Sequence, residues 1–451
     1  MTPAAPAENE PANSLDIGVV GSGISGLAAA WLLAQRHRVT LYEADARLGG
    51  HSHTVDVAVR GTPVAADTGF IVYNEPAYPN LTALFAHLGV ATKASEMSFA
   101  VSLDGGALEY AGSDLRGLFA QRGNLVNLRF WSMLRDLVRF YRRAPLDAAR
   151  VGLMPLDEYL DANGYGRAFR EDHLYPMAAA IWSTPAAQIG GYPTEAFIRF
   201  CENHHLRTLG GRPAWRTVAG GSREYVRRLA EVLGDRVRLA SAAVAVRRDA
   251  RGAAVVTGRG EARHDHVVVA THADQALRLL ADTSSDERRL LGAFAYSRNR
   301  AVLHSDPALM PRRRAVWSSW NYAAHRRRPD APCVTYWMNR LQGLDERLPL
   351  FLTLNPIREP RPDLRLRTEI YEHPLFDAAA IRAQDELWSL QGRQRTWFCG
   401  AYFGSGFHED GLQAGLAVAE AIGGVRRPWS VAGESARIRI HARADAAVAA
   451  A

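Results

Sequence analysis

Three glycines near residue 20 have the spacing of a turn that binds a dinucleotide. Residues 21–26 read GSGISG and lie between an apolar run suited to a buried strand and a helical stretch. In such a turn Gly21 permits the tight bend, Gly23 lets the backbone approach a pyrophosphate, and Gly26 lets the helix pack on the strand. The pyrophosphate then meets the N–H groups and the positive dipole of the helix N-terminus.

An acidic residue stands where this kind of site needs one. Glu43 ends a second apolar strand, residues 38–43, and follows Gly23 by about 20 residues, the spacing at which a carboxylate accepts hydrogen bonds from a ribose. The two strands and the helix between them, residues 24–35, form a βαβ unit. The pattern therefore predicts a Rossmann-like α/β fold.

The elements that position these residues must come from several parts of the chain. Its 451 residues exceed the roughly 250–300 at which a single core stops growing, so we expect two domains. Segments of α/β character recur at residues 220–280 and 396–423. Two aromatic-rich insertions separate them. Residues 1–14 lack the basic and apolar regions of a secretory signal, and we expect them to form a disordered leader.

Charge and cysteine content limit the class of protein. The net charge is +7, yet Lys93 is the only lysine, so the positive charge is almost all arginine. This reflects either an arginine-favouring genome or attraction to an anionic surface. No nucleic-acid-binding module accompanies it. The three cysteines form no framework, and His204-His205 has no partner spacing. We therefore expect a cytoplasmic protein without a metal site or a nucleic-acid partner.

A second glycine motif follows Glu43 directly. Residues 47–54 read RLGGHSHT. They resemble the R-x-G-G-x-x-x-T element of flavin amine oxidases, protoporphyrinogen oxidases and phytoene-type desaturases. The resemblance implies a non-covalently bound FAD whose phosphates and ribityl chain lie along this segment. Many relatives have a further arginine where this chain has His51.

Four more segments extend the resemblance. Residues 67–70, DTGF, look like the segment that passes near the isoalloxazine, and Val244 looks like the valine whose backbone faces adenine. Residues 267–271 match the strand beneath the cofactor. Residues 398–401 and 406–411 match the C-terminal element in which a helix N-terminus points at the pyrimidine edge and would stabilise charge on reduced flavin.

Together the motifs imply a discontinuous FAD-binding domain of the GR2 type with a mixed α+β substrate domain inserted. The FAD-binding domain comprises residues 15–74, 216–285 and 396–424, the substrate domain 75–215 and 286–395, and a C-terminal extension 425–451. Ala401 departs from the many relatives that have an acid there. The implied cofactor-binding residues are Gly21, Ser22, Gly23, Ile24, Ser25, Gly26, Glu43, Ala44, Arg47, Gly49, Gly50, His51, Thr68, Gly69, Phe70, Val244, Ala270, Thr271, Gly400, Ala401, Gly406, Phe407 and His408.

The substrate is harder to predict, because a flavin accepts a hydride at N5 without demanding a side-chain base. Flavin amine oxidases usually place a lysine near N5 and cage the amine with aromatic rings. Here Lys93 lies in the early insertion, and the matching ring is Phe407, which lacks a hydroxyl. Both favour dehydrogenation of an apolar substrate. The alternatives are an amine oxidase, a non-redox flavin isomerase, or a flavoprotein scaffold for a lipid-modifying partner.

A narrower resemblance concerns residues 67–74, DTGFIVYN, and 406–412, GFHEDGL. They resemble a bacterial branch that accompanies enzymes methylating or cyclopropanating phospholipid acyl chains. Some of its members are linked to desaturating methylated fatty acyl chains. The resemblance implies a lipid acyl substrate, and it leaves the exact substrate, the electron acceptor (oxygen, quinone or another) and the oligomeric state open.

Three side chains are candidates for roles beyond holding the cofactor. His408 and His51 could transfer a proton at neutral pH, or could only donate a hydrogen bond to the flavin. Trp182 is a candidate for lining the substrate tunnel along with Phe407, although a tryptophan at that position also suits a buried core.

Residues 124–143 have the pattern of an amphipathic helix. Arginines 129, 135, 139, 142 and 143 lie opposite an apolar face. This pattern suits a helix in the interface of an anionic membrane, which would place the protein on the inner face of that membrane. It equally suits a helix that packs on a core. The apolar face comprises Val126, Phe130, Trp131, Met133, Leu134, Leu137, Val138, Phe140 and Tyr141.

Overall fold

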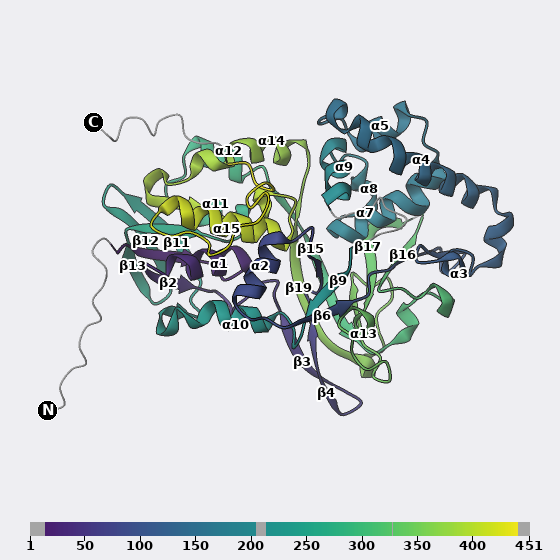
Figure 1. Ribbon diagram of the computed structural model, residues 1–451, viewed down its shortest axis with the longest axis horizontal. Coiled ribbons are helices and arrows are strands. Elements are labelled where there is room, and N and C mark those ends of the chain that lie inside the picture. The colour runs from purple at the N-terminus through teal and green to yellow at the C-terminus, as the bar shows by residue number, and fades with distance from the viewer. Residues whose placement is uncertain (1–13, 204–212, 327, 441–451) are drawn as a thin grey trace. The chain divides into compact units, whose positions relative to one another are not determined.

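The computed structural model describes residues 14–203, 213–326 and 328–440 (Figure 1). Three parts of the sequence discussed above lie outside these residues. They are residues 1–13 of the predicted leader, the His204-His205 pair, and residues 441–451 of the predicted C-terminal extension. The chain forms two compact units, which are described separately. The first comprises Met1–Gly50, Tyr225–Gly292 and Gln384–Ala451, and the second His51–Glu224 and Ala293–Ala383.

The first unit is built on a five-stranded parallel sheet in the order β10-β2-β1-β14-β20. Its central strand is apolar and buried, as parallel strands covered on both faces must be. Helices α1 (Ile24–Leu33) and α15 (His408–Ile422) pack against each other (Figure 1). This arrangement confirms the predicted Rossmann-like α/β class. The strands are β1 (Asp16–Val20), β2 (Arg38–Tyr42), β10 (Val237–Arg238), β14 (His266–Val269) and β20 (Thr396–Phe398).

A small antiparallel sheet completes this unit. It contains β11 (Ala243–Asp249), β12 (Gly252–Thr257) and β13 (Gly260–His264). The sequence pattern predicts one continuous strand over 237–248, and this prediction is wrong. The chain breaks after β10, where Ala240 adopts a positive φ of 46°. The two halves therefore join different sheets.

The second unit is built on a seven-stranded mixed sheet in the order β19-β15-β18-β17-β16-β7-β8. Its neighbours are antiparallel except for β16 and β7. The strands are β7 (Phe99–Leu103), β8 (Leu108–Ala111), β15 (Ala295–His304), β16 (Trp320–His325), β17 (Arg328–Trp337), β18 (Phe351–Leu354) and β19 (Arg365–Leu375).

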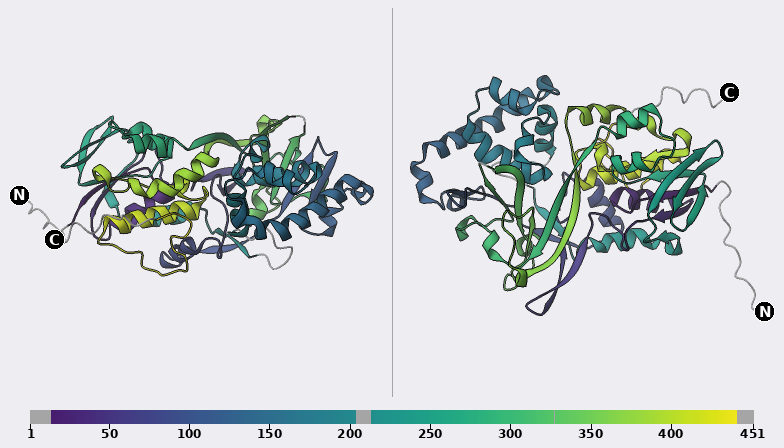
Figure 2. Two further views of the ribbon diagram at one scale, coloured as in Figure 1. Left: turned by 90° about the horizontal axis from the view of Figure 1, so that it is seen from above. Right: turned by 180° about the vertical axis from the view of Figure 1, so that it is seen from behind.

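Helices gather beside this sheet (Figure 2). Helix α7 packs on β16 and β17, and α4 packs on α6 and α9. The combination is the mixed α+β architecture expected of the insertions. The helices are α3 (Leu115–Leu118), α4 (Leu128–Val151), α5 (Leu156–Ala162), α6 (Arg167–Phe169), α7 (Tyr175–Trp182), α8 (Ala186–Ile189) and α9 (Thr194–Asn203).

The remaining strands make small sheets in the second unit. Strands β3 (Thr54–Val59) and β4 (Thr62–Asp67) form a hairpin around Arg60-Gly61. Strands β5 (Tyr73–Asn74) and β6 (Thr92–Ser95) pair with β9 (Trp215–Val218). Because β3 also contacts β19, the contacts place residues 51–74 in this unit, whereas the sequence motifs group them with the FAD-binding segments.

Three further segments fall differently from the predicted boundaries. Residues 286–292 and 384–395 belong to the first unit, and residues 216–224 belong to the second. Helix α12 (Ser285–Leu291) carries Glu287, which forms a buried ion pair with Arg248 of β11. That pair ties the helix to the antiparallel sheet. Among the residues that the structure describes, no helix is both long and apolar enough to cross a bilayer.

Candidate functional site

The glycine turn leaves the N-terminus of α1 open. Gly23 is the N-cap residue, no side chain caps the helix, and its first turn contains no acidic residue. The whole helix is buried, so its dipole acts in a poorly solvated environment. An anion is the group that such a helix end binds.

The three glycines of the turn are required for different reasons. A Cβ at Gly21 would lie 2.8 Å from the Ala270 carbonyl oxygen, and one at Gly26 would lie 1.9 Å from the Gly21 carbonyl oxygen. A Cβ at Gly23 would meet nothing within 4 Å. Contacts within the protein therefore exclude a side chain at Gly21 and Gly26. At Gly23 they do not, and a Cβ there would obstruct only a ligand. This geometry fits the close approach of a pyrophosphate.

The second glycine pair lies against the first motif. Gly49 and Gly50 both have positive φ, 108° and 55°, which glycine adopts without strain. The Gly49 N–H donates to the Ser22 carbonyl at 3.1 Å, and a Cβ at Gly50 would lie 3.2 Å from the Gly23 Cα. Arg47 donates to the Gly50 carbonyl at 2.9 Å and holds the loop in this shape.

Glu43 ties the second strand to the glycine turn. One carboxylate oxygen accepts from the Ser22 N–H at 2.8 Å and from the Ser22 hydroxyl at 2.5 Å. The other accepts from the Asp45 N–H at 2.9 Å, across the exposed Ala44. The carboxylate is thus fixed beside the turn, at the position where the motif places a ribose.

The C-terminal motif lies beside the glycine turn and the N-terminus of α1. A Cβ at Gly411, in the first turn of α15, would lie 3.0 Å from Ile24 Cγ2 and 3.7 Å from the Ala401 Cβ. One at Gly400 would lie 3.5 Å from the Thr271 carbonyl oxygen. The N-terminal turns of α1 and α15 are therefore neighbours. The structure brings together the predicted residues Gly21–Gly26, Glu43, Gly49–Gly50, Ala270–Thr271 and Gly400–Ala401.

Val244 stands apart from this group. Its side chain is 61% exposed, at a bulge in β11. The segment just before it is fastened to the end of β2, because the Ser241 N–H donates to the Glu43 carbonyl at 2.8 Å. Its place near Glu43 is compatible with a backbone contact to adenine.

His408, the first residue of α15, makes a short contact with a residue that the sequence analysis did not single out. Its Nε2 lies 2.7 Å from the hydroxyl of Tyr225, in α10 (Arg223–Glu231). Burial lowers the pKa of the His408 imidazole to about 3, so the ring is neutral at physiological pH. The Asp410 carboxylate accepts from the N–H of the neighbouring Phe407 at 2.8 Å. A neutral ring favours the hydrogen-bonding role over the proton-carrying role.

In the second unit, His51 lies in an aromatic and polar cluster. Its ring is 5.0 Å from that of Tyr371 and 5.4 Å from that of His373, both in β19. The Tyr371 hydroxyl lies 2.6 Å from the Thr68 hydroxyl and 3.1 Å from His53 Nδ1. Neither Tyr371 nor His373 belongs to a motif, although their i, i+2 spacing puts both on one face of a strand.

The predicted flavin-side turn is held close to His51. The Phe70 N–H donates to the His51 carbonyl at 2.7 Å, and a Cβ at Gly69 would lie 2.1 Å from that oxygen. The structure thus brings together His51, Thr68, Gly69 and Phe70, as the motifs imply.

The turn rests on a buried carboxylate. Asp67 accepts from the Thr54 hydroxyl at 2.6 Å, from the N–H and hydroxyl of Ser222 at 2.9 and 2.8 Å, and from Gln342 Nε2 at 2.8 Å. Gln342 Oε1 in turn accepts from the Asp67 N–H at 2.9 Å. Burial raises the pKa of Asp67 to about 6 despite these donors.

Trp182 and Lys93 both lie in the second unit. Trp182 is 5% exposed, and its ring packs 4.4 Å from that of Phe200 and 4.9 Å from that of Tyr192. These are the contacts of a core residue, which was the alternative to a tunnel position. Lys93 is exposed on β6, where its ammonium lies 3.5 Å from the Gly343 carbonyl.

Comparison with known proteins agrees with this geometry. A family model described as "Flavin containing amine oxidoreductase" matches residues 24–297. The Mycobacterium tuberculosis protein AofH, which carries the name of a flavin-containing monoamine oxidase, is 28% identical over 275 residues. The aligned part is 58% of this chain and 58% of AofH, so the chain spans little more than half the length of this relative.

Two solved structures share the fold. Cyclohexylamine oxidase from Brevibacterium oxydans superposes with a TM-score of 0.66 at 16% identity, covering 91% of this chain and 99% of the other. A fatty acid isomerase from P. acnes, described as producing CLA, gives 0.63 at 14% identity, covering 90% and 98%. Proteins that carry the names of an amine oxidase and of a fatty acid isomerase thus share this architecture.

Proposed function

This chain belongs to the family of flavin-containing amine oxidoreductases and has FAD as its cofactor, and we propose that it dehydrogenates an apolar substrate, a lipid fatty acyl chain. One observation carries the choice of an apolar substrate. The only lysine of the chain is Lys93, and it lies exposed on β6 beside the Gly343 carbonyl. The lysine that the resemblance places near N5 in amine oxidases therefore has no counterpart in this chain.

The residues around the start of α15 support an apolar substrate. Phe407 supplies a ring without a hydroxyl, and His408 is neutral because burial lowers the pKa of its imidazole to about 3. Neither side chain would bind an ammonium group by charge. A hydrocarbon chain, by contrast, gains free energy when it leaves water for such surroundings.

Each group of residues has a distinct task in the proposed reaction. The open N-terminus of α1 would bind the pyrophosphate, and Glu43 would orient the ribose. Bound FAD would supply a hydride acceptor at N5. The substrate would lose a hydride from one carbon to that acceptor and a proton from the next carbon, which would leave a carbon–carbon double bond. His51, in contact with Tyr371 and His373, is the residue that we propose accepts the proton.

The cofactor is proposed to be held without a covalent bond. Cys399 lies within the C-terminal motif, and burial raises the pKa of its thiol to about 12. The thiolate needed for a thioether link is therefore scarce at neutral pH. Purified protein should be yellow and release free FAD on acid treatment.

Amine oxidation is the second candidate, and the family name together with the name of AofH favours it. Anaerobic mixing separates the two. We expect dispersed phospholipid with saturated or methyl-branched acyl chains to bleach the flavin, and a panel of primary and secondary amines to leave it oxidised. Bleaching by an amine and not by lipid would reverse the assignment. Rearranged lipid without flavin reduction would identify an isomerase, and no response to any compound would leave the scaffold alternative.

A further inference from the structure

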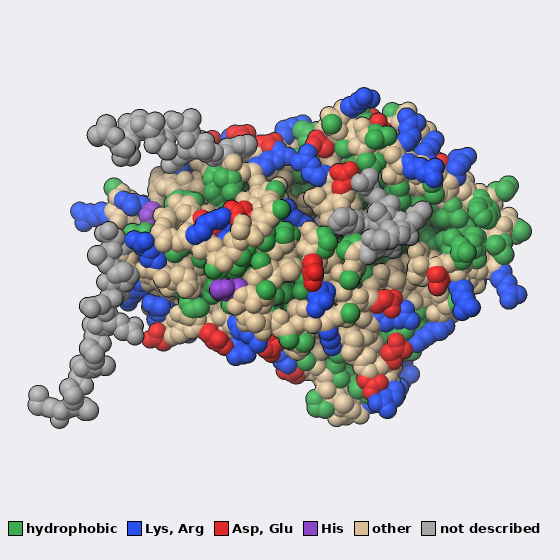
Figure 3. Space-filling view, in the orientation of Figure 1, with side chains coloured by type: hydrophobic (Ala, Val, Ile, Leu, Met, Phe, Trp, Pro, Cys, Tyr) green, Lys and Arg blue, Asp and Glu red, His purple; other side chains and the backbone are tan. Residues whose placement is uncertain are grey.

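One end of the second unit exposes several large apolar side chains to solvent. We call this set the apolar tip. It is formed by α3, the 3-10 turn Arg122–Val126 and the start of α4, and Figure 3 shows hydrophobic side chains gathered over the end of the molecule where these elements lie. Its members are Leu115 (73% exposed), Leu125 (52%), Val126 (84%), Leu128 (85%) and Trp131 (47%).

The apolar tip shares only Val126 and Trp131 with the helix face that the sequence pattern indicates. Helix α4 begins at Leu128 rather than 124, and Phe130, Met133 and Phe140 are buried. The Phe140 ring contacts those of Phe169, Tyr165 and others in the helical group. Part of the apolar face of α4 therefore packs on the core, which is the alternative that the sequence pattern left open, while Leu134, Leu137, Val138 and Tyr141 are half-buried. Contact of this face with a membrane stays a prediction. The exposed side chains lie at the helix N-terminal end.

The apolar tip has a defined conformation. The Trp131 Nε1 donates to the Leu125 carbonyl at 2.9 Å, which fixes the 3-10 turn against the helix. The Phe119 ring packs 5.7 Å from that of Trp131. Asn127 caps α4, because its side chain accepts from the N–H groups of Arg129 and Phe130. A surface ordered in advance loses little conformational entropy when it binds.

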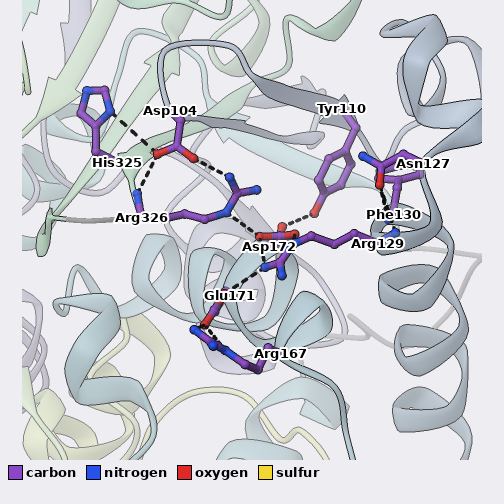
Figure 4. Close-up of polar contacts among 10 residues, drawn as sticks. All are labelled: Asp104, Tyr110, Asn127, Arg129, Phe130, Arg167, Glu171, Asp172, His325 and Arg326. Atoms are coloured by element: carbon purple, nitrogen blue, oxygen red, sulfur yellow. Dashed lines mark hydrogen bonds and ion pairs between the residues drawn. The ribbon is translucent and has the colours of Figure 1, made fainter.

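A network of ion pairs fastens the base of the apolar tip (Figure 4). Arg129 donates to Asp172 at 2.7 Å and to Glu171 at 2.9 Å. Arg326 donates to the same Asp172 at 2.9 Å and also pairs with Asp104. Arg129 therefore serves to hold α4 in place, with its charge paired to two carboxylates.

The charges around the apolar tip are mainly positive. Arg116 and Arg122 are exposed within the segments that form it, and Arg135 is 70% exposed one turn beyond Trp131. Arg135 contacts the buried Asp136, and Asp114 accepts from the Gly117 N–H as the cap of α3. Arg116 and Arg122 are thus the cations best placed to meet an anionic surface.

We propose that the apolar tip inserts into the surface of an anionic phospholipid bilayer, with Arg116 and Arg122 at the level of the headgroups. Exposed leucine and valine side chains gain free energy in the acyl region, and tryptophan prefers the interface. Arginine beside them adds attraction to anionic lipid. A bilayer fits this combination because it can take up projecting apolar side chains and pair with the arginines beside them, whereas a protein partner would need a groove of matching shape. The proposal does not depend on the substrate of the flavin.

Vesicle flotation with the full FAD-loaded chain tests the proposal. We expect the protein to float with phosphatidylglycerol-containing vesicles at low salt and to float less with phosphatidylcholine alone. Val126→Glu/Leu128→Glu should reduce partitioning by at least about tenfold, because two exposed apolar side chains no longer enter the bilayer. The matched control Leu146→Glu/Ile357→Glu replaces side chains that are 77% and 51% exposed elsewhere and should float like the wild type.

A fluorescent label distinguishes insertion of the apolar tip from other modes. Cys201, Cys333 and Cys399 are all buried, so an introduced surface cysteine can be labelled selectively. A polarity-sensitive dye at Val126→Cys should shift to the blue with vesicles. The same dye at Leu146→Cys, about 27 Å further along the helix, should not.

Three results would overturn the proposal. The first is a wild-type protein that stays out of the vesicle fraction at low salt. The second is a blue shift at both labels, which would mean that the whole length of α4 meets the bilayer. The third is a dimer in light scattering that becomes a monomer in Val126→Glu/Leu128→Glu and binds no vesicles, which would make the surface an interface between copies.

Discussion

The Nε2 atom of His408 and the hydroxyl of Tyr225 lie 2.7 Å apart at the start of α15, the last helix of the first unit. Tyr225→Phe removes this hydrogen bond and should lower the free energy of unfolding by about 1 kcal/mol. Because the pKa of His408 is lowered to about 3 by burial, the ring is already neutral between pH 5 and 9. The pH profile of flavin reduction over that range should therefore be the same in wild type and variant. An ionisation near neutrality that shifts in Tyr225→Phe would show that His408 does carry a proton.

Gly23 and Gly26 should respond differently to the same substitution. Gly23 has φ −62° and ψ 175°, which alanine adopts freely, and its Cβ would meet nothing in the protein. Gly23→Ala should leave the apoprotein as stable as wild type and weaken FAD binding by roughly 100-fold, equivalent to about 2.7 kcal/mol. Gly26→Ala should instead destabilise the apoprotein by roughly 3 kcal/mol, since its Cβ would overlap the Gly21 carbonyl. Apoprotein melting and FAD titration measure the two effects. Equal FAD affinity in Gly23→Ala would contradict the assignment of the pyrophosphate site.

Asp67 and Gln342 should form a compensating pair. Asp67→Asn turns an amide N–H₂ toward Gln342 Nε2, and one buried donor loses its acceptor at a cost of about 1–3 kcal/mol. Gln342→Glu alone places a second carboxylate beside the first and should cost at least as much. In Asp67→Asn/Gln342→Glu the new carboxylate accepts from both the side-chain amide and the backbone N–H at position 67, so most of the stability should return. Urea unfolding of the four proteins measures the coupling, and additive losses would show that the hydrogen bonds are not the cause.

Acid should destabilise the protein below about pH 6.5. Burial lowers the pKa of His173 and His304 to about 4 and that of His408 to about 3. Between about pH 6.5 and 4 these histidines are therefore protonated in the unfolded chain but neutral in the folded chain. The free energy of unfolding falls over this range by up to roughly 1.4 kcal/mol per pH unit for each histidine. Asp67 acts in the opposite sense, because its pKa is raised to about 6 and its contribution is lost as the pH rises through that value.

The urea midpoint at pH 7.5, 6.0 and 5.0 tests this balance. Three histidines outweigh two aspartates, Asp67 and Asp410, whose pKa burial also raises, so the midpoint should fall with pH. His304→Gln should flatten the slope, because a side-chain amide can bond both the Thr353 hydroxyl and the Asp306 N–H without titrating. A midpoint that rises on acidification would mean that carboxylates such as Asp67 dominate.

The cofactor side of the fold follows from local sequence patterns. GSGISG, the acid at 43 and the paired glycines are short motifs whose physics is local, and the structure brings them together at one helix N-terminus. The class of sheet could be predicted for the same reason. The position of the strand break at Ala240 could not, because a single residue with positive φ leaves no mark in an apolar pattern.

The second unit was less predictable because its contacts are distant in sequence. Tyr371 reaches Thr68 across some three hundred residues, and no local pattern links β19 to the turn after β4. The apolar pattern of α4 predicted its helical nature, but the partner of that face could only be found in the structure. The apolar tip could be predicted only at Val126 and Trp131, since its residues come from two short elements and the start of α4 rather than from one periodic helix.

The packing of α1 against α15 has a consequence for biosynthesis. A Cβ at Gly415 would lie 2.1 Å from the Ser25 carbonyl oxygen, so the two helices touch backbone to backbone, although one is translated almost four hundred residues before the other. The glycine turn leaves the ribosome early but acquires its covering helix only after the entire second unit has been synthesised. Such long-range closure slows folding. The nascent chain can therefore complete the cover of the glycine turn only after its last helix has been translated.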